Sequence, residues 1–291
     1  MGLFSQFSKL LSGGRVDVFA RYELMRQAVS GSMSEFHVAR DRETGQLVGL
    51  KILDAEKTAH FESRFKGLKK PSEGEIAKAL SHPNIVQTYE YGQTSDGRQY
   101  IVMELVDGPG LNSLIIGRSP QLDGKRLPLL RQAAEAIGAV HAAGYIHRDI
   151  CPRNLIVDKD CQTLKLIDFG LTVPMKGEFL QPGNRTGTPN YMAPEIVRRK
   201  KTDQRVDIFA LGVTAYALCT YELPWSGGTT GKAAMSHDTQ EPVDIRQRRP
   251  QLNTRLAQAI MKCLEPLPEN RPPDTETFLK MIAGVTREDQ K

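Results

Sequence analysis

The sequence predicts an α+β protein built from a small β-rich lobe and a larger helical lobe. Between residues 22 and 103, apolar and polar residues alternate in several short runs, which is typical of half-buried strands. After Gly108 the apolar residues recur at helical spacing instead. A chain of 291 residues is long enough for two such lobes. We therefore expect the lobes to span 15–106 and 107–291, after an N-terminal leader of residues 1–14.

The first lobe is expected to contain two β-hairpins. The runs FHVAR at 36–40 and QLVGLKIL at 46–53 alternate on either side of the turn sequence DRETG. Further along the chain, NIVQTYEYG and RQYIVMELV flank the turn sequence SDG. Both pairs therefore predict antiparallel strands joined by short loops.

Helices are expected between these hairpins and throughout the second lobe. Residues 61–80 include many charged helix formers, but Pro71 should break a helix there. Ser72, followed three residues later by Glu75, forms a capping box that indicates a new helix start at 72. Three further segments have apolar residues at helical spacing, namely 122–143, 206–220 and 253–264.

Composition and charge exclude several classes of protein. Apolar residues make up 40% of the chain and charged residues 25%, so a globally disordered chain is not expected. The most apolar stretch, Ile208 to Leu218, is too short to form a transmembrane helix. The net charge is +5, and the basic residues cluster at 198–201 and 246–249. We interpret these clusters as solvated faces rather than as surfaces for nucleic acid or an anionic membrane.

The cysteines and the N-terminus bear on the cellular compartment. No two of the four cysteines have a CxxC spacing, so neither a zinc site nor a thioredoxin-like site is expected, and a reducing cytoplasm fits. The N-terminal sequence MGLFSQFSKLL lacks the basic region of a secretory signal, and Gln6 stands where a myristoylation signal has Ser or Thr. A frayed leader is favoured over a weak amphipathic membrane anchor.

Several motifs occur in a specific order. YIHRDICPRNLIVD spans 145–158, LKLIDFGL spans 164–171 and GTPNYMAPE spans 187–195. Upstream, VGLK ends at Lys51, and Glu73 lies 22 residues later. With these motifs the chain resembles a eukaryotic-type (Hanks-type) protein kinase, most like the bacterial Ser/Thr branch. The resemblance implies the bilobal kinase fold and ATP-dependent transfer of a phosphoryl group to Ser or Thr hydroxyls of a protein substrate.

The resemblance assigns catalytic roles to three polar residues of the second lobe. Phosphoryl transfer requires mainly positioning and charge neutralisation, and Mg²⁺ prefers carboxylate and amide oxygens. Asp168 and Asn154 are therefore the expected metal ligands. Asp149 is placed to accept a hydrogen bond from the substrate hydroxyl. The separations of 5 and 19 residues between them fit a short loop and a hairpin that meet in one cleft.

In the first lobe, the resemblance assigns a role to an ion pair. Lys51 is expected to bind the α- and β-phosphates of ATP and to pair with a helix glutamate. Glu73 matches that glutamate by its nine-residue spacing to His82. Glu75 is the alternative, although the capping box already gives it a structural role.

The resemblance also implies an adenine pocket. Met103 is expected to flank it, and the backbones of Glu104 and Val106 to bond the adenine edge. The remaining residues expected around the nucleotide are Val29, Gly31, Phe36, Gly49, Ile156 and Ile167.

The nucleotide-binding residues depart from the family pattern in two places. The glycine loop is VSGSMS at 29–34, in which Val29 and Ser34 replace the outer glycines and only Gly31 remains. Glycine normally allows the backbone to approach phosphate closely. Phe36 stands where Val is usual, and Gly49 where Ala is usual. The larger ring either fits against the missing methyl group or fills the adenine space.

The catalytic loop departs from the Ser/Thr pattern as well. Cys151 replaces the lysine that normally follows the catalytic aspartate by two residues, and a neutral thiol cannot neutralise a γ-phosphate. Arg153, four residues after Asp149, is similar to the arginine of many tyrosine kinases and is expected to substitute, although a surface arginine is the alternative. Cys151 is also a candidate redox-sensitive thiol.

Other matches to the family concern support and regulation. Asp207 resembles the aspartate that holds the catalytic-loop backbone, and Thr188 the threonine that contacts the catalytic aspartate. In the family, Arg148 often receives a phosphate from the activation segment, for which Thr186 is the best candidate here. Two further pairs resemble structural contacts of the family, the ion pair of Glu195 with Arg271 and the stacked His147 with Phe169.

An active Ser/Thr kinase with ATP and Mg²⁺ is thus the leading hypothesis. A pseudokinase that acts as a scaffold is the main alternative, because the glycine loop and Cys151 depart from the pattern. Small-molecule phosphotransfer is less favoured, since GTPNYMAPE is typical of the Ser/Thr protein kinases. SGGTTGKA at 226–233 does not fit a P-loop, because Ser226 and Ala233 occupy positions that need Gly and Ser or Thr.

Overall fold

The computed structural model describes residues 15–30, 34–183, 185–225 and 240–290. The chain divides into two compact units. Unit 1 comprises Met1–Ser81 and Val86–Leu105, and unit 2 comprises His82–Ile85 and Val106–Lys291. Gly31 and the segment SGGTTGKA lie outside the described residues, as does the leader.

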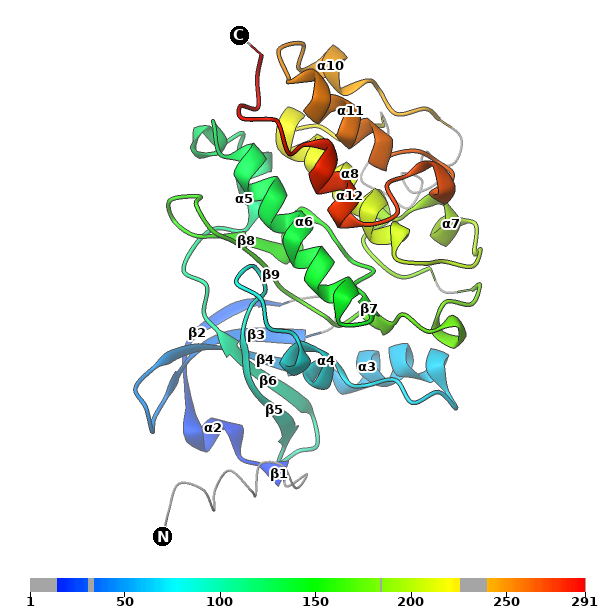
Figure 1. Ribbon diagram of the computed structural model, residues 1–291. Coiled ribbons are helices and arrows are strands. Elements are labelled where there is room, and N and C mark those ends of the chain that lie inside the picture. Colours follow the sequence, from blue (N-terminus) through cyan, green and yellow to red (C-terminus); the bar gives the residue numbers. More distant parts are fainter. Residues whose placement is uncertain (1–14, 31–33, 184, 226–239, 291) are drawn as a thin grey trace. The chain divides into compact units, whose positions relative to one another are not determined.

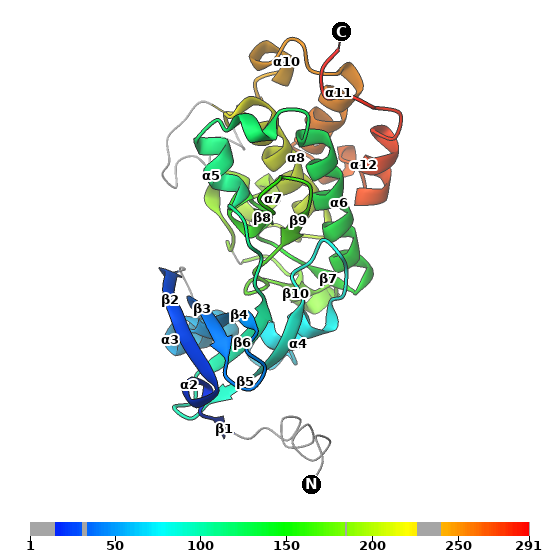
Figure 2. The ribbon, with the colours of Figure 1, turned by 90° about the vertical axis from the view of Figure 1, so that its left-hand side faces the viewer.

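Unit 1 is built on a β-sheet with the strand order β1-β5-β6-β4-β3-β2 in its described part (Figures 1 and 2). β1 and β5 pair in parallel, and all other neighbours are antiparallel. Both predicted hairpins are present, as β3–β4 and β5–β6. The strands are β1 Arg15–Val16, β2 Tyr22–Ser30, β3 Ser34–Asp41, β4 Leu47–Leu53, β5 Thr88–Thr94 and β6 Gln99–Glu104.

The register of the central strands places the predicted nucleotide-binding residues next to one another. Lys51 on β4 pairs with Phe36 on β3 and with Ile101 on β6. Gly49, two residues earlier on β4, pairs with Met103 on β6. Because side chains two residues apart on a strand point to the same face, Lys51 and Gly49 share one face of this sheet.

Pro71 lies in a break between helices, as predicted, but the break begins earlier than expected, since residues 66–72 are not helical. A first helix, α3 (Ala55–Glu62), is followed by the short 3₁₀ helix η1 (Ser63–Phe65), and a second helix, α4 (Glu73–Ala79), begins after Pro71. The predicted capping box is present, with Ser72 as the N-cap and Glu75 bonded back to the Ser72 backbone. In the described part of unit 1, the remaining helix is α2 (Val18–Arg21).

Gly74 explains why α4 packs so closely on the sheet. A Cβ atom at this position would lie 2.6 Å from Cβ of Tyr91 on β5. No real side chain fits at that distance, so the glycine lets the helix backbone approach the strand. The residue lowers helix propensity but allows the contact that holds α4 in place.

Unit 2 is mainly helical. The helix α8 is buried on every side from Val206 to Cys219, and it contacts α6 and α11 (Figures 1 and 2). At Gly212 a Cβ atom would lie 2.6 Å from Cβ of Cys263, so α8 and α11 pack closely. The α-helices of unit 2 that the structure describes are α5 Leu111–Ile116, α6 Arg126–Ala142, α7 Pro194–Val197, α8 Arg205–Thr220, α10 Ile245–Arg248, α11 Thr254–Cys263 and α12 Thr275–Met281.

The segments that connect these helices contain short strands and 3₁₀ helices. Two antiparallel pairs, β8–β9 and β7–β10, bracket the predicted catalytic segments. The strands are β7 Tyr145–Ile146, β8 Leu155–Val157, β9 Leu164–Leu166 and β10 Val173–Pro174. The 3₁₀ helices are η2 Pro120–Leu122, η3 Pro152–Asn154, η4 Gly177–Phe179, η5 Pro189–Tyr191 and η6 Pro268–Asn270.

Two further observations concern the whole described chain. All four cysteines, Cys151, Cys161, Cys219 and Cys263, are buried free thiols. Among the described residues, none of the helices combines the length and the apolar character that crossing a membrane would require.

Candidate active site

The ion pair predicted in unit 1 is formed. Nζ of Lys51 donates to Oε1 of Glu73 at 2.5 Å, and both side chains are buried. Glu73 is the first residue of α4. Glu75, the alternative partner, instead accepts from the Ser72 backbone N–H at 2.7 Å. The structure therefore separates the two carboxylates into a partner of Lys51 and a helix cap.

Phe36 and Gly49 compensate for one another in unit 1. A Cβ atom at Gly49 would lie 2.9 Å from two ring atoms of Phe36 and 3.1 Å from Cγ of Met103. The Phe36 ring thus occupies the space that the methyl group of an alanine would need. The two departures from the family pattern are a single exchange of volume between β3 and β4.

The other nucleotide residues predicted in unit 1 are only partly described. Val29 lies in β2, and its side chain is outside the described part of the structure. The backbone N–H of Glu104 donates to the carbonyl of Gln87 at 2.8 Å. This N–H is therefore not the group that would bond an adenine edge.

In unit 2, three donors hold the carboxylate of Asp149. The backbone N–H of Thr188 donates to Oδ1 at 2.7 Å, and the Thr188 hydroxyl donates to the same oxygen at 2.8 Å. Nδ2 of Asn154 donates to Oδ2 at 3.0 Å. The predicted contact of Thr188 is present, and the carboxylate has a fixed orientation at the half-buried end of the loop.

Asn154 and Asp168 lie on neighbouring backbone segments. The N–H of Ile167, directly before Asp168, donates to the carbonyl of Asn154 at 2.9 Å. The Asn154 amide nitrogen is used by Asp149, since it also donates to the Asp149 carbonyl at 2.8 Å. The amide oxygen of Asn154 has no hydrogen-bond donor among the described residues, and Asp168 is exposed with φ of +65°. An amide oxygen and a carboxylate fit a Mg²⁺ ion.

Asp207 of α8 binds the backbone of the catalytic loop through hydrogen bonds. This carboxylate is fully buried and accepts the backbone N–H groups of His147 and Arg148, each at 2.8 Å. Nε2 of His141 lies 2.9 Å from its Oδ2. Burial alone would raise the pKa of Asp207, but the hydrogen bond and charge of His141 lower it below the ordinary value.

Arg148 has a strained backbone that this network fixes. Its φ is +67°, in the left-handed region that costs an ordinary residue about 1–2 kcal/mol. The opposing residue is Gly187, where a Cβ atom would lie 2.8 Å from the Arg148 carbonyl oxygen. Only glycine allows this approach, also because φ of Gly187 is +122°. The roles of Gly187 and His141 were not predicted from the sequence, although Gly187 is the first residue of the motif GTPNYMAPE.

Cys151 is a buried free thiol. Its side chain is only 1% exposed, and its Sγ lies 3.6 Å from the Thr188 hydroxyl. Burial and the nearby charge of Asp149 raise the pKa of Cys151 to about 11. The hypothesis of a redox-sensitive thiol in an electropositive pocket is therefore wrong. Arg153 is exposed on η3, next to the same loop.

The structural contacts predicted around the site are also present. His147 and Phe169 form an edge-to-face pair with ring centroids 5.3 Å apart. Arg271 binds Glu195 with two hydrogen bonds, at 2.7 and 2.8 Å, and both side chains are buried. Val106 precedes α5, Ile156 lies in β8, and Ile167 follows β9.

The guanidinium of Arg148 is buried with few partners. Its Nη2 donates to the Thr202 hydroxyl at 3.3 Å, whereas Nε and Nη1 have no hydrogen-bond partner within the described residues. Burial lowers the pKa of Arg148. The Thr186 hydroxyl is likewise buried without a partner in the described chain.

The fold, the three motifs and the oriented carboxylate define a protein kinase, and comparison with known proteins agrees. Residues 22–281 match the protein kinase domain family, to which this chain belongs. The chain is 33% identical over 274 residues to the serine/threonine-protein kinase PknB of Mycobacterium leprae, covering 92% of this chain and 43% of that protein.

Two further relatives give the same result. PknB of Mycolicibacterium smegmatis is 32% identical over 275 residues, covering 92% of this chain and 43% of the relative. Serine/threonine-protein kinase pkn3 of Myxococcus xanthus is 29% identical over 284 residues, covering 92% of this chain and 50% of the relative. The chain thus spans about half the length, or less, of these relatives.

Proposed function

We propose that this chain transfers the γ-phosphoryl group of ATP to Ser or Thr hydroxyls of a protein substrate. The observation that carries the proposal is the Asp149 carboxylate, oriented by Thr188 and Asn154 beside the exposed Asp168. The relatives named serine/threonine-protein kinases support the same class of acceptor. The four buried free thiols favour a reducing cytoplasm.

In the proposed reaction, Asp149 accepts a hydrogen bond from the substrate hydroxyl and takes its proton as the new bond forms. The hydroxyl oxygen bonds to the γ-phosphorus, while the bond from the γ-phosphorus to the bridging oxygen breaks and ADP leaves. Thr188 and Asn154 fix the carboxylate in one orientation, which reduces the reorganisation needed at the moment of transfer.

ATP and Mg²⁺ are the cofactors that we propose. Mg²⁺ neutralises phosphate charge when bound, and Asn154 and Asp168 would hold it. Lys51 would bind phosphate oxygens, with Glu73 restricting its ammonium group to one position. Arg153 is proposed to supply the positive charge that Cys151 cannot, because it is exposed and its guanidinium is always charged.

The test is a transfer assay with radiolabelled ATP, Mg²⁺ and a generic basic protein. We expect incorporation of label that falls at least about 100-fold in Asp149→Asn and in Lys51→Met. Asp160→Asn, an exposed aspartate in the loop before β9, is the matched control and should retain activity. Label that persists in both active-site variants would indicate a contaminating kinase, and no label in the parent protein would refute the proposal.

Regulation through the activation segment is proposed for Thr186 and Arg148. Two nitrogens of the buried Arg148 guanidinium have no partner in the described chain, and such a group suits a phosphate oxygen. Because the Thr186 hydroxyl is buried, its modification requires the segment to open. Mass spectrometry after incubation with Mg²⁺ and ATP should locate phosphate at Thr186. Phosphate confined to other residues would reject this assignment.

A further inference from the structure

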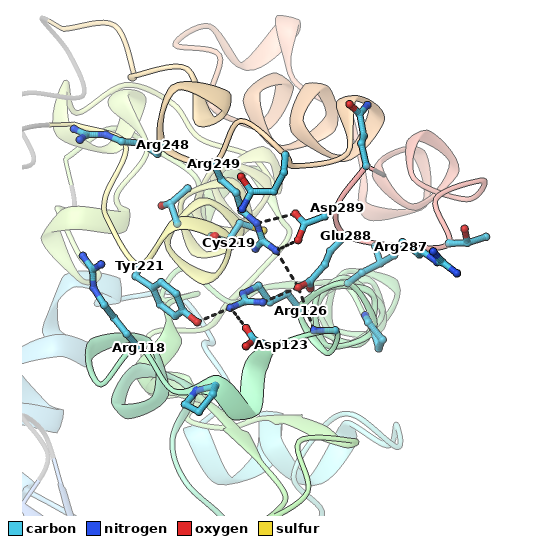
Figure 3. A pocket seen from close by; sticks show the side chains of 18 of the residues that line it. Arg118, Asp123, Arg126, Cys219, Tyr221, Arg248, Arg249, Arg287, Glu288 and Asp289 are labelled. Atoms are coloured by element: carbon cyan, nitrogen blue, oxygen red, sulfur yellow. Dashed lines mark hydrogen bonds and ion pairs between the residues drawn. The ribbon is translucent and has the colours of Figure 1, made fainter.

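Unit 2 contains a cavity of about 980 Å³ that none of the predicted catalytic residues lines (Figure 3). Its walls come from η2 and the start of α6, the end of α8, the end of α10 and the segment 286–290. Six arginines line it, whereas only three carboxylates do. The arginines are Arg118, Arg126, Arg131, Arg248, Arg249 and Arg287.

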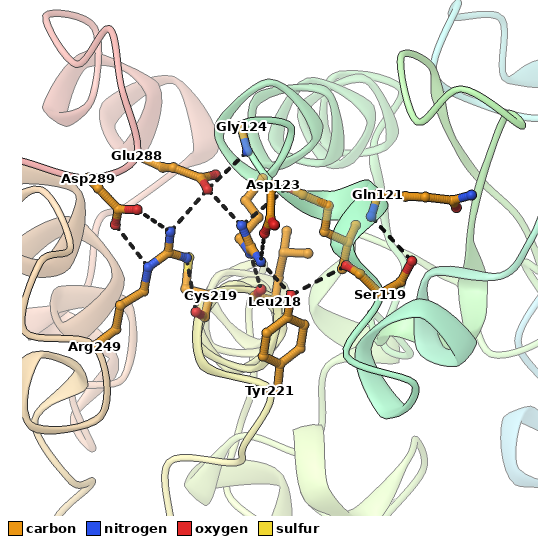
Figure 4. A network of polar contacts seen from close by, with 12 residues as sticks. Ser119, Gln121, Asp123, Gly124, Leu218, Cys219, Tyr221, Arg249, Glu288 and Asp289 are labelled. Carbon is orange, nitrogen blue, oxygen red and sulfur yellow. Dashed lines mark hydrogen bonds and ion pairs between the residues drawn. The ribbon is translucent and has the colours of Figure 1, made fainter.

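The two innermost arginines, Arg126 and Arg249, bind carboxylates of the chain itself. Figure 4 shows Arg249 with Glu288 and Asp289, and Asp123 in the same network. Arg249 binds Asp289 with two hydrogen bonds, at 2.9 and 2.6 Å, and reaches Glu288 at 3.0 Å. Arg126 binds Oε1 of the same Glu288 at 2.6 Å, and Asp123 at 2.8 Å. Burial without these carboxylates would leave two charges uncompensated, so this inner network is structural.

The acidic segment is held as an extended peptide. Asp289 forms a β-bridge with Leu252, the N–H of Asn253 donates to the Glu288 carbonyl at 2.8 Å, and the N–H of Gln290 donates to the Gln251 carbonyl at 2.8 Å. Backbone hydrogen bonds fix its register while adjacent carboxylates bind guanidinium groups. In this wall of the cavity, a segment of the chain itself is therefore held both by its backbone and by ion pairs of its carboxylates with arginines.

The three outer arginines, Arg118, Arg248 and Arg287, have only one carboxylate partner between them among the described residues. The side chains of Arg118 and Arg248 are 67% and 38% exposed, and they share a single carboxylate, Glu222, at 3.9 and 3.1 Å. Arg287 is exposed and forms no hydrogen bond or ion pair with any residue that the structure describes. Figure 3 shows Arg287 on one side of the inner network, and Arg118 and Arg248 on the other.

We propose that this cavity is a docking site for an acidic segment of a partner protein. The excess of arginine over carboxylate gives the cavity a positive potential, and each outer guanidinium presents a planar fork that matches a carboxylate. The exposed amide side chain of Gln251 in the wall suits a peptide backbone. Binding here is independent of phosphoryl transfer, so its test does not require an active kinase.

The test is fluorescence anisotropy with a fluorescein-labelled hexapeptide of alternating Glu and Asp. We expect binding that weakens as salt increases, and an analogue of Gln and Asn that does not bind. In the variant Arg118→Ala/Arg248→Ala/Arg287→Ala, the affinity should fall about tenfold, since each exposed pair contributes modestly.

Two variants control for charge and folding. Arg246→Ala/Lys262→Ala/Lys280→Ala removes three exposed positive charges from the same unit without touching the cavity lining, and should change the affinity less than about twofold. Arg118→Lys/Arg248→Lys/Arg287→Lys keeps the charge and should retain most of the binding. Equal losses in the cavity and control variants would overturn the proposal, as would no binding by the parent protein. Tighter binding of inorganic tripolyphosphate than of the peptide would overturn the peptide assignment.

Discussion

Replacing Asp207 should destabilise the catalytic loop, because its side chain holds the loop backbone. Its buried carboxylate accepts three hydrogen bonds, two of them from the loop backbone at His147 and Arg148 and one from His141. Asp207→Ala leaves those donors buried without an acceptor. Asp207→Asn keeps an acceptor oxygen for one backbone N–H but turns an amide donor toward the other.

The magnitude follows from these contacts. Hydrogen bonds to a charged group contribute about 1.5–3 kcal/mol each, and breaking a buried charged network by removing one partner costs about 3–5 kcal/mol. We therefore expect Asp207→Ala to lower the free energy of unfolding of unit 2 by about 3–5 kcal/mol, and Asp207→Asn by about 2 kcal/mol. Loss of the two backbone bonds also releases the strained φ of Arg148, so transfer activity should fall in both variants.

The assay is urea unfolding followed by tryptophan fluorescence. Trp225 is the single tryptophan of the chain, and it is buried against Phe209 of α8 with ring centroids 5.8 Å apart. Its emission therefore reports on unit 2. The matched control is Asp203→Asn, whose partner Arg205 is partly exposed, with an expected loss below about 1 kcal/mol. A loss in Asp207→Ala no larger than in this control would refute the reasoning.

Three further predictions follow from the same geometry. Gly49→Ala should displace the Phe36 ring and so weaken the binding of ATP, as measured by calorimetry. Adding Phe36→Val should restore the affinity. Losses of affinity that simply add in the double variant would contradict the exchange of volume. Cys151, with a pKa of about 11, should not react rapidly with Ellman's reagent at pH 8, and a fast phase lost in Cys151→Ala would contradict its burial. The pKa of Asp207 is lower in the folded protein than in the unfolded chain. The carboxylate therefore stabilises the fold fully above its unfolded pKa of about 3.9, and this stabilisation disappears as the pH falls through the folded pKa. Acid unfolding should consequently be less steep in Asp207→Asn than in the parent protein.

Local sequence signals predicted the fold where short-range chemistry decides it. The capping box of Ser72 and Glu75 fixed the start of α4, and it also separated Glu75 from Glu73 as the partner of Lys51. The alternating runs gave both hairpins, because period-two patterns depend only on neighbouring residues. The helix α3 was not predicted, because most of its residues precede 61–80, the segment in which helix formers were recognised.

Features that depend on distant parts of the chain were not predictable from one sequence. The basic cluster 246–249 was interpreted as a solvated face, yet Arg249 is buried between Glu288 and Asp289, about 40 residues later. The exchange of volume between Phe36 and Gly49 likewise requires the register of β3 and β4. Neither pairing leaves a local periodic signal.

The position of Glu73 at the very beginning of α4 has a mechanical consequence. If the carboxylate lay within a long helix, withdrawing it from Lys51 would require the entire helix to move as a rigid body. Here the carboxylate belongs to the first turn of a seven-residue helix, whose entry is secured by one serine hydroxyl and one glutamate. Opening such a cap costs only about 1 kcal/mol. The larger cost of withdrawing Glu73 is therefore that of separating the buried ion pair with Lys51 itself.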